Sequence, residues 1–299
     1  MANYLIKDFY IGINDVDANL ALSPRAALLL LQDVATEHAK DCGFGWDAMH
    51  GAGKFWVLTK IKVFFVKPVK AYQTVSVETW PLEPGRLYAE RDFVVRNKDG
   101  NVIIIATSRW CVVDFNSRKL AKPSDIEHLT CITYRTDRAK DASGLNGVDI
   151  TTNAEKAPSI LIPSKIVPTS PTNASATTDI VKAPTIYSTE STLKSNPLEF
   201  ARIALDDTFK KSYSITTRWT DIDVNNHVNN TRYADFAINA LSLETISKAE
   251  LQEFEVNYSH ELKINQTVDI VLSASDNTYK TIGTKDGITA FSACFKFKN

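Results

Sequence analysis

The sequence predicts an α+β fold made of two similar halves, in each of which one helix lies against an antiparallel sheet. Each half contains one helical segment followed by consecutive runs rich in β-branched and aromatic residues. Short matching stretches recur in the two halves, and a segment rich in Ser, Thr, Asn, Pro and Ala separates them. With 299 residues, 44% of them hydrophobic, the chain is long enough for two ordinary domains.

The first half is expected to begin with a helix over residues 25–37. Ser23 is a favourable N-cap residue, and Pro24 suits the first helical position. The helix is apolar nearly all round, so we expect it to be buried. The turn sequence Asn97-Lys98-Asp99-Gly100 predicts a hairpin between two of the strands that follow. Those strands are expected at residues 55–66, 74–80, 87–96 and 102–114.

The second half repeats this order after the polar segment. We expect a strand at residues 212–219 and then a helix from Asn229 or Asn230 to about Ser242. Further strands are expected at residues 253–258, 267–274, 279–284 and 288–297. The resulting division is an N-terminal domain over residues 1–138, a surface linker over 139–210 and a C-terminal domain over 211–299.

Local identities connect the two halves. Asp15 matches Asp221 at an offset of 206 residues, and Lys70 matches Lys263 at an offset of 193. Lys98-Asp-Gly matches Lys285-Asp-Gly at an offset of 187, so the offset falls where loops of the second half are shorter. The shared element order and these identities favour internal duplication with pseudo-twofold symmetry.

Composition and charge exclude several classes of protein. The net charge of −1 gives no general attraction to nucleic acid or to an anionic membrane. The sequence opens without a leader and has no apolar run long enough to span a bilayer, which favours a reduced, cytoplasmic protein. The histidines form no ligand pair, and we expect no metal site and no cofactor. Four scattered cysteines are expected to be small buried hydrophobes: Cys42, Cys111, Cys131 and Cys294.

A dense polar run, residues 219–230, lies between a predicted strand and a predicted helix. It contains Asp223, Asn225 and His227. The start of a buried helix offers unpaired N–H groups and the positive end of a dipole, which suit an oxygen that gains negative charge. Asp and Asn also cap turns and helices, so the run by itself is balanced between a capped turn and a site for carbonyl chemistry.

The first half helps to distinguish these interpretations. It keeps the same spacing at Asp17 and Asn19 but has Ala21 in the place of His227. The offset of 193 likewise takes Glu261 to Pro68. His227 and Glu261 are therefore expected to work together as a base and its partner in activating water. His260, the neighbour of Glu261, should turn to the opposite face and be exposed.

The segments DIDVNNHVNNTRYADFAINAL and FEVNYSHEL, with WVLTKIKVFF and VSVETW in the first half, resemble the acyl-acyl carrier protein thioesterases of bacteria and plant plastids. The resemblance runs from about Tyr10 to Phe297. It implies a tandem hotdog fold, with two long helices each wrapped by an antiparallel β-sheet. It also implies hydrolysis of the thioester of acyl-acyl carrier protein (acyl-ACP), which releases a free fatty acid.

The resemblance also assigns the site. It places Asp223, Asn225, His227 and Glu261 on the catalytic positions of the family. The chain departs from plant members at Leu262, where they carry a cysteine that was proposed as the nucleophile. Because leucine cannot attack a thioester, we expect hydrolysis by water.

We expect Glu261 and His227 to take the proton from the attacking water while Asp223 orients the network. The oxyanion would be stabilised by Asn225 together with the backbone N–H of Val228 or Asn229. Direct attack by Asp223 remains open at this stage.

For the acyl chain, the resemblance implies a tunnel in the first half, where the helix is apolar. Chain-length preference is expected to respond to bulk at Leu28, Leu31, Val57 or Thr59. Acyl carrier protein is the expected partner, and its acidic surface would need local lysines. The candidates are Lys60, Lys62, Lys67, Lys70, Lys210 and Lys211. Pairing into a homodimer is left open, since hotdog proteins often pair.

Two other interpretations also stay open. His and Glu facing a helix start would serve another hotdog enzyme, such as an acyl-CoA thioesterase or a hydroxyacyl dehydratase. A non-catalytic acyl-binding module is the second alternative, although no attached DNA-binding motif would give a sensor its output.

Overall fold

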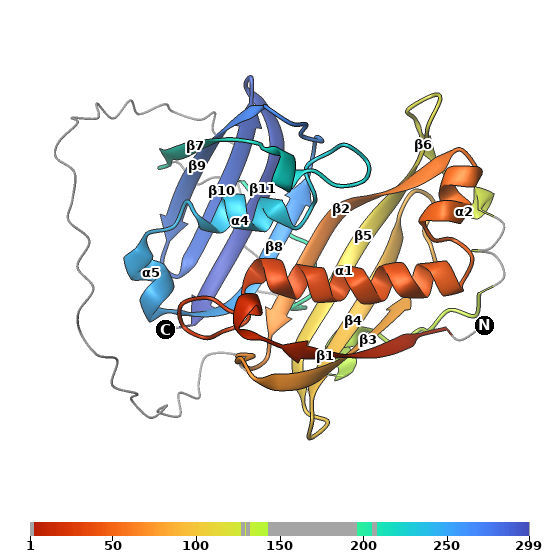
Figure 1. Cartoon of the computed structure of the whole chain (residues 1–299), viewed down its shortest axis with the longest axis horizontal. Helices are drawn as coiled ribbons and strands as arrows, with labels where there is room; N and C mark the ends of the chain where they lie inside the picture. Colours follow the sequence, from red (N-terminus) through yellow and green to blue (C-terminus); the bar gives the residue numbers. More distant parts are fainter. Residues whose placement is uncertain (1–2, 127–128, 130–131, 143–195, 205–207, 299) are drawn as a thin grey trace.

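The computed structural model describes residues 3–126, 129, 132–142, 196–204 and 208–298. One antiparallel sheet runs through both halves, with α1 against its N-terminal part and α4 against its C-terminal part (Figure 1). Each half is thus a sheet that wraps a helix. The α+β tandem hotdog expected from the sequence is confirmed.

The N-terminal half is built around α1 (Pro24–Asp41). The Ser23 hydroxyl accepts a hydrogen bond from the Ala26 N–H at 3.2 Å, and Pro24 opens the helix, as expected. The helix buries one face rather than its whole circumference, because Asp33, Thr36 and Glu37 are exposed. The other elements of this half are β1 (Leu5–Ile11), α2 (Trp46–Gly51), β2 (Lys54–Phe65), β3 (Gln73–Pro81), β4 (Ala89–Asn97), β5 (Val102–Asp114) and β6 (Leu120–Ala121).

Strand β1 was not predicted from the sequence. Its side chains alternate between exposed and partly buried, but each face mixes apolar and charged residues. The pairing of β1 with β3 therefore depends on tertiary contact rather than on a local apolar pattern. The hairpin after β4 is as predicted, since the Gly100 N–H donates to the Asn97 carbonyl and Gly100 has a φ of 79°.

The C-terminal half is built around α4 (Arg232–Ile238), which is much shorter than α1. The predicted helix up to Ser242 is wrong at its end, because Ser242 starts a new helix by accepting a hydrogen bond from the Thr245 N–H at 3.2 Å. The other elements are β7 (Lys210–Thr216), α5 (Leu243–Lys248), β8 (Glu250–Tyr258), β9 (Thr267–Ser275), β10 (Thr278–Lys285) and β11 (Ile288–Lys298).

The sheet order makes the pseudo-twofold symmetry visible. From one edge it runs β1-β3-β4-β5-β2, and from the other β7-β9-β10-β11-β8, so the two halves repeat the same order. They join where β2 pairs with β8. In this junction Lys62 lies directly opposite Glu255, and the offset between them is again 193 residues. The pseudo-twofold axis therefore passes through this pair.

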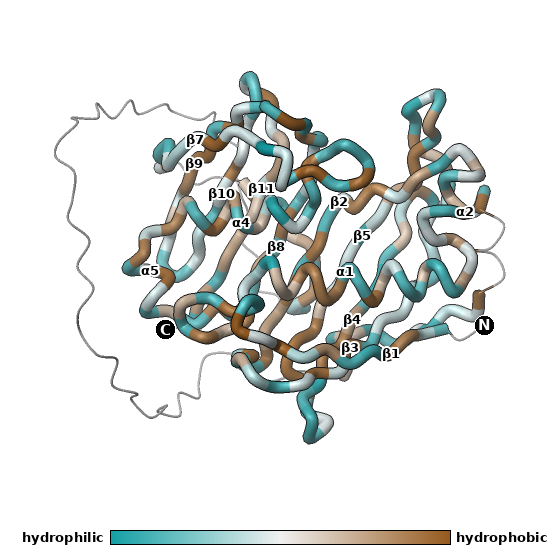
Figure 2. Tube along the Cα trace, in the orientation of Figure 1, coloured by the Kyte–Doolittle hydropathy of each residue, from teal (hydrophilic) through white to brown (hydrophobic). Residues whose placement is uncertain are grey.

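The core is continuous across the two halves. One apolar cluster joins the buried face of α1, the inner face of the sheet and residues of α4 such as Tyr233 and Phe236. Figure 2 shows apolar residues along α1 and along the strands behind it. Because this cluster crosses the junction, the halves fold against a shared interior.

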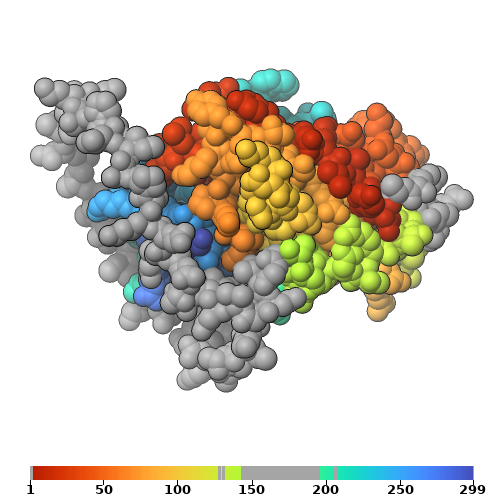
Figure 3. Space-filling model, turned by 90° about the horizontal axis from the view of Figure 1, so that it is seen from below, coloured from red at the N-terminus to blue at the C-terminus, as the bar shows by residue number. Residues whose placement is uncertain are grey.

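Both described ends of the predicted linker are fixed to the sheet. Ala139 in α3 (Ala139–Ala142) and Leu198 belong to a second apolar cluster that includes Trp80. Figure 3 shows the start of this segment, in lime, on the surface beside the yellow hairpin. Residues 143–195, most of the predicted linker, lie outside the described residues. The domain boundaries at 138 and 211 remain predictions.

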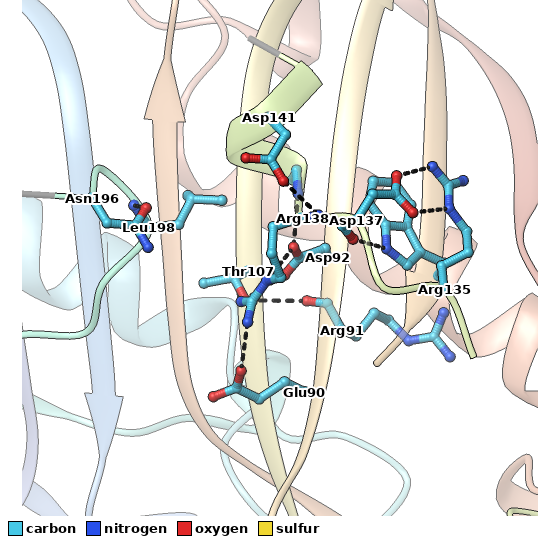
Figure 4. A network of polar contacts seen from close by, with 12 residues as sticks. Glu90, Arg91, Asp92, Thr107, Arg135, Asp137, Arg138, Asp141, Asn196 and Leu198 are labelled. Atoms are coloured by element: carbon cyan, nitrogen blue, oxygen red, sulfur yellow. Dashed lines mark hydrogen bonds and ion pairs between the residues drawn. The ribbon is translucent and has the colours of Figure 1, made fainter. Parts of the chain in front are cut away.

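Ion pairs hold the start of this segment in place (Figure 4). The Arg138 guanidinium binds both carboxylate oxygens of Asp92, whose side chain is fully buried, at 2.9 and 3.2 Å. Burial raises the pKa of Asp92, and Arg138 opposes that rise. The Trp80 indole N–H also donates to the Asp137 carbonyl at 3.1 Å.

Candidate active site

The polar run of the C-terminal half and its counterpart in the N-terminal half form the same loop. In one loop the Asn225 N–H donates to Asp223 Oδ1, and in the other the Asn19 N–H donates to Asp17 Oδ1, both at 2.8 Å. The residue that follows each asparagine has a positive φ, 60° in the C-terminal half and 56° in the N-terminal half. The spacing shared by the two halves is therefore the turn of the fold.

The same correspondence extends into the surrounding backbone. The Asp223 N–H donates to the His227 carbonyl at 2.9 Å, as the Asp17 N–H donates to the Ala21 carbonyl at 2.8 Å. Several side chains differ between the loops, but an ionisable group differs at one position, where one loop has an imidazole and the other a methyl group. The frame is structural in both halves, and the ionisable group belongs to one.

The imidazole makes the contact that the sequence predicted. His227 Nε2 lies 3.1 Å from Glu261 Oε2, and the side chains are 22% and 51% exposed, respectively. Glu261 follows the end of β8, while His227 precedes α4. A loop and a strand end thus bring together the two residues that have no counterpart in the other half.

Two tyrosine hydroxyls bind the backbone beside this pair. The Tyr233 hydroxyl accepts the Leu262 N–H at 3.2 Å, next to Glu261, and the Tyr258 hydroxyl donates to the Asn230 carbonyl at 3.0 Å. Their rings meet edge to face at 5.3 Å. Burial raises the pKa of both hydroxyls, and the nearby Glu261 carboxylate raises that of Tyr233 further. Both tyrosines are therefore neutral supports.

The backbone donors expected for the oxyanion have other partners. The Val228 N–H donates to the Leu262 carbonyl and the Asn229 N–H to the Asp221 carbonyl, each at 2.7 Å. These bonds attach the loop to the strand end and to the preceding turn. Neither N–H is free for a substrate oxygen.

Asn225 is contacted from the opposite half. The indole N–H of Trp46, at the start of α2, lies 3.3 Å from Asn225 Oδ1. No local pattern marked Trp46 as a functional residue, because the contact joins positions 179 residues apart. Only the packing of the halves reveals it.

A groove of about 1470 Å³ connects the candidate catalytic pair with the N-terminal half. Asp223, Asn225, His227 and Glu261 line it at one side. Its lining continues along the helices and strands of the N-terminal half through Ala35, Met49, Phe44, Trp56, Val57, Leu58, Leu82 and Trp110. The arrangement can hold a long apolar group whose head lies beside His227 and Glu261.

The four predicted tail-binding residues are distributed differently. Val57 lines the groove. Leu28 and Leu31 are 3% and 1% exposed in the main core, where they border a small void of about 10 Å³. Thr59 is not part of the groove lining, and its hydroxyl donates to the Arg109 carbonyl at 2.9 Å.

A buried polar cluster that the sequence did not reveal also borders the groove. Arg91 is 6% exposed, and its guanidinium donates to His38 Nδ1 at 3.0 Å and to the Thr79 hydroxyl at 3.2 Å. Because arginine only donates, His38 Nδ1 accepts and its proton lies on Nε2, which is 3.5 Å from Cys42 Sγ. Burial lowers the pKa of Arg91 to about 10. The groove lining thus includes one buried guanidinium.

The structure also locates the residues discussed as nucleophiles. Leu262, at the position of the plant cysteine, is 1% exposed and part of the core. Cys42 and Cys111 are buried as expected, whereas Cys294 is only partly buried. Cys131 lies outside the described residues. His260 is exposed, as predicted, but it lines the same groove as Glu261 instead of turning to the opposite face, and its Nδ1–H donates to the Thr289 carbonyl at 2.7 Å.

The prediction that Lys62 contributes to docking is wrong. Lys62 is 5% exposed and lies 3.2 Å from Glu253 and 3.7 Å from Glu255, so it cannot contact a partner. The sequence predicts that Lys62 is available for docking, but residues 199–201 cover the outer face of the strand through contacts to Lys62 and Glu255. Lys67, Lys70, Lys210 and Lys211 are exposed.

The described part of the chain contains no group of three or more His, Cys, Asp or Glu side chains arranged to bind a metal ion. None of its helices has the length and apolar character needed to cross a membrane.

Comparison with known proteins matches this architecture. The N-terminal domain model of acyl-ACP thioesterases matches residues 3–127, and the C-terminal domain model matches residues 204–292. The chain is 23% identical over 291 residues to oleoyl-acyl carrier protein thioesterase 1, chloroplastic, of Arabidopsis thaliana, covering 95% of this chain and 67% of that protein. It is 22% identical over 270 residues to the palmitoyl-acyl carrier protein thioesterase, chloroplastic, of the same plant, covering 87% and 51%. The chain thus spans between half and two thirds of these relatives.

Solved structures share the fold over the whole chain. An acyl-ACP thioesterase from Bacteroides thetaiotaomicron superimposes with a TM-score of 0.69 at 21% identity, covering 99% of this chain and 98% of that one. The 12:0-ACP thioesterase from Umbellularia californica gives a TM-score of 0.73 at 18% identity, covering 100% and 98%. Both family models match in their expected order, one on each half of the tandem fold, and the chain belongs to the acyl-ACP thioesterase family.

Proposed function

We propose that this protein hydrolyses the thioester of acyl-ACP and releases a free fatty acid. The observation that carries the proposal is the contact of His227 Nε2 with Glu261 Oε2, 3.1 Å apart, beside a groove that leads into the N-terminal half. Membership of the acyl-ACP thioesterase family and similarity to two plant acyl carrier protein thioesterases support the same reaction.

Water is the nucleophile in this proposal. A carboxylate only accepts hydrogen bonds, so His227 donates its Nε2 proton to Glu261 Oε2. Glu261 Oε1 then accepts a proton from a water molecule as that water attacks the thioester carbonyl. When the tetrahedral intermediate collapses, the C–S bond breaks, and the Glu261–His227 pair returns the proton to the departing carrier thiolate. The products are a carboxylic acid and the free thiol.

Asn225 stabilises the oxyanion in this proposal, without help from Val228 or Asn229. Its side chain lines the groove, and its Oδ1 is taken by the Trp46 indole, which leaves the Nδ2 group to donate to the substrate. Asp223 acts as a positioning residue, because its carboxylate holds the Asn225 backbone N–H at 2.8 Å. The acyl tail extends along the groove past Val57 in the N-terminal half.

A panel of acyl-ACP thioesters of different chain lengths tests the reaction, with free thiol and free fatty acid measured together. We expect equal amounts of thiol and fatty acid, because hydrolysis releases one of each. A hydroxyacyl dehydratase would release no thiol, and an acyl-binding module would retain the intact thioester. Faster turnover of the matching acyl-CoA would support an acyl-CoA thioesterase instead.

Docking of the acidic carrier is proposed to use exposed lysines. Lys67 and Lys70 flank the turn after β2, and Lys210 and Lys211 begin β7. Salt screens such contacts, so the Michaelis constant for acyl-ACP should rise with ionic strength while that for a small thioester does not. A homodimer and a cytoplasmic location remain predictions from the sequence.

A further inference from the structure

The hydrogen bond between Trp46 and Asn225 has an equivalent in the other half, where the asparagine donates instead of accepting. Asn19, the equivalent of Asn225, donates from its Nδ2 to the Ile246 carbonyl at 2.8 Å. Ile246 belongs to α5, which follows the main helix of the C-terminal half as α2 follows that of the N-terminal half. Each loop asparagine is therefore held by the short helix of the opposite half.

The chemistry of the two contacts differs in which end of the amide they use. An indole N–H can only donate, so the Trp46 contact must engage Asn225 Oδ1. A carbonyl can only accept, so the Ile246 contact must engage Asn19 Nδ2. In the C-terminal half, which contains His227, the Nδ2 group of Asn225 remains available to donate. In the N-terminal half the Nδ2 group of Asn19 is already bonded to the Ile246 carbonyl.

We propose that Trp46 is a positioning residue that orients the Asn225 amide with its Nδ2 group toward the thioester oxygen. This inference rests on the proposed thioester hydrolysis and assigns it one residue of the opposite half. Among the described residues Asn225 Nδ2 has no hydrogen-bond acceptor, whereas Asn225 Oδ1 accepts from Trp46. Without that donor, the amide can turn its oxygen toward the developing oxyanion, which repels it.

The surroundings of Trp46 suit such a role. The side chain is 51% exposed, so its apolar burial contributes little to the fold, but it is held by stacking on His50 with ring centroids 4.8 Å apart. Both rings also line the groove. The indole is thus fixed at the same groove wall as the amide that it binds.

The test replaces Trp46 with Phe, which keeps an aromatic ring on His50 and removes the N–H. In steady-state hydrolysis of acyl-ACP, kcat should fall roughly 3- to 10-fold, the scale of one hydrogen bond, while KM changes little. Asn225→Ala should lower kcat roughly 100- to 1000-fold as the loss of an oxyanion donor. Trp46→Phe added to Asn225→Ala should lower kcat no further, because there is no amide left to orient.

Trp80→Phe is the matched control. Trp80 also donates its indole N–H, to the Asp137 carbonyl at 3.1 Å, but it lies in the cluster on the outer face of the sheet. This variant should lower the unfolding temperature and leave kcat unchanged. Trp46→Phe with unchanged kcat, or with an equal loss in the Asn225→Ala background, overturns the inference while the wild-type protein still hydrolyses acyl-ACP. A wild-type protein without hydrolysis overturns the proposed function itself.

Discussion

Lys62 of β2 and Glu255 of β8 face each other across the junction of the two halves, and each is the counterpart of the other in the internal repeat. Their charged atoms lie 3.7 Å apart, and the exposed fractions of the residues are 5% and 2%. Glu253 lies between Lys62, at 3.2 Å, and Lys296, at 3.1 Å. A network of two carboxylates and two lysines thus occupies the pseudo-twofold axis, and all of its members except Lys296 are buried.

This network should make Lys62→Met strongly destabilising. Removing one partner leaves a buried carboxylate uncompensated, which costs about 3–5 kcal/mol of the free energy of unfolding. Lys62→Met combined with Glu255→Met should recover most of this loss, because Lys296 and Glu253 still balance each other. Urea denaturation followed by circular dichroism measures both. As a control, Lys248→Met removes an exposed pair with Glu244 and should change stability little. A Lys62→Met protein as stable as the wild type would contradict this account of the network.

The catalytic assignment predicts that Glu261→Gln abolishes proton transfer and leaves the shape of the site intact. The expected decrease in kcat for acyl-ACP is about 100- to 10,000-fold, with a smaller change in KM. Glu250→Gln, at the other end of β8 and paired with Lys298 at 2.9 Å, is the matched control and should keep full activity. Near-normal turnover of Glu261→Gln would remove this residue from the role of base.

Because Val57 lines the groove, we expect Val57→Phe to shift the products toward shorter chains. Each methylene kept out of the groove forfeits about 0.8 kcal/mol, so kcat/KM should fall about tenfold or more for every two carbons beyond the new limit. Product analysis by gas chromatography measures the shift. Val66→Phe makes the same enlargement beside the outer cluster and should leave chain lengths unchanged. An unaltered product profile for Val57→Phe would place the tail elsewhere.

Thiol reagents should not inhibit the enzyme at pH 8. Burial raises the pKa of the Cys42 and Cys111 thiols above their usual value and raises that of Cys294 to about 11, so little reactive thiolate is present at pH 8. Alkylation of these thiols should be slow at pH 8, accelerate as the pH rises and become fast in urea. A Cys131→Ser variant removes the remaining cysteine from the measurement. Rapid loss of hydrolysis that acyl-ACP prevents would instead point to a cysteine nucleophile.

Much of the fold was accessible from the sequence because its signals are local. Ser23 and Pro24 predicted the start of α1, and Gly100 predicted a hairpin turn that needs a positive φ. The comparison of His227 with Ala21 identified the ionisable pair, since duplication supplies an internal control. These features depend on short-range chemistry or on direct matching of the two halves.

The features that the sequence did not reveal depend on how the halves meet. From the sequence Lys62 is expected to be available for docking, but β8 and residues 199–201 cover it. Trp46 gained its role only because α2 reaches the loop of the other half. The Val228 and Asn229 N–H groups seemed available because helix starts often leave donors unpaired, but tertiary contacts with Leu262 and Asp221 occupy them. No local periodicity encodes these long-range contacts.

The opposite charges of Lys62 and Glu255 bear on which domains can share this junction. A second copy of either half in the place of the other would put two lysines or two glutamates against each other in a dry interface, where like charges repel. Each half is therefore a poor partner for a copy of itself and a good one for the other half, and a single ion pair makes that distinction.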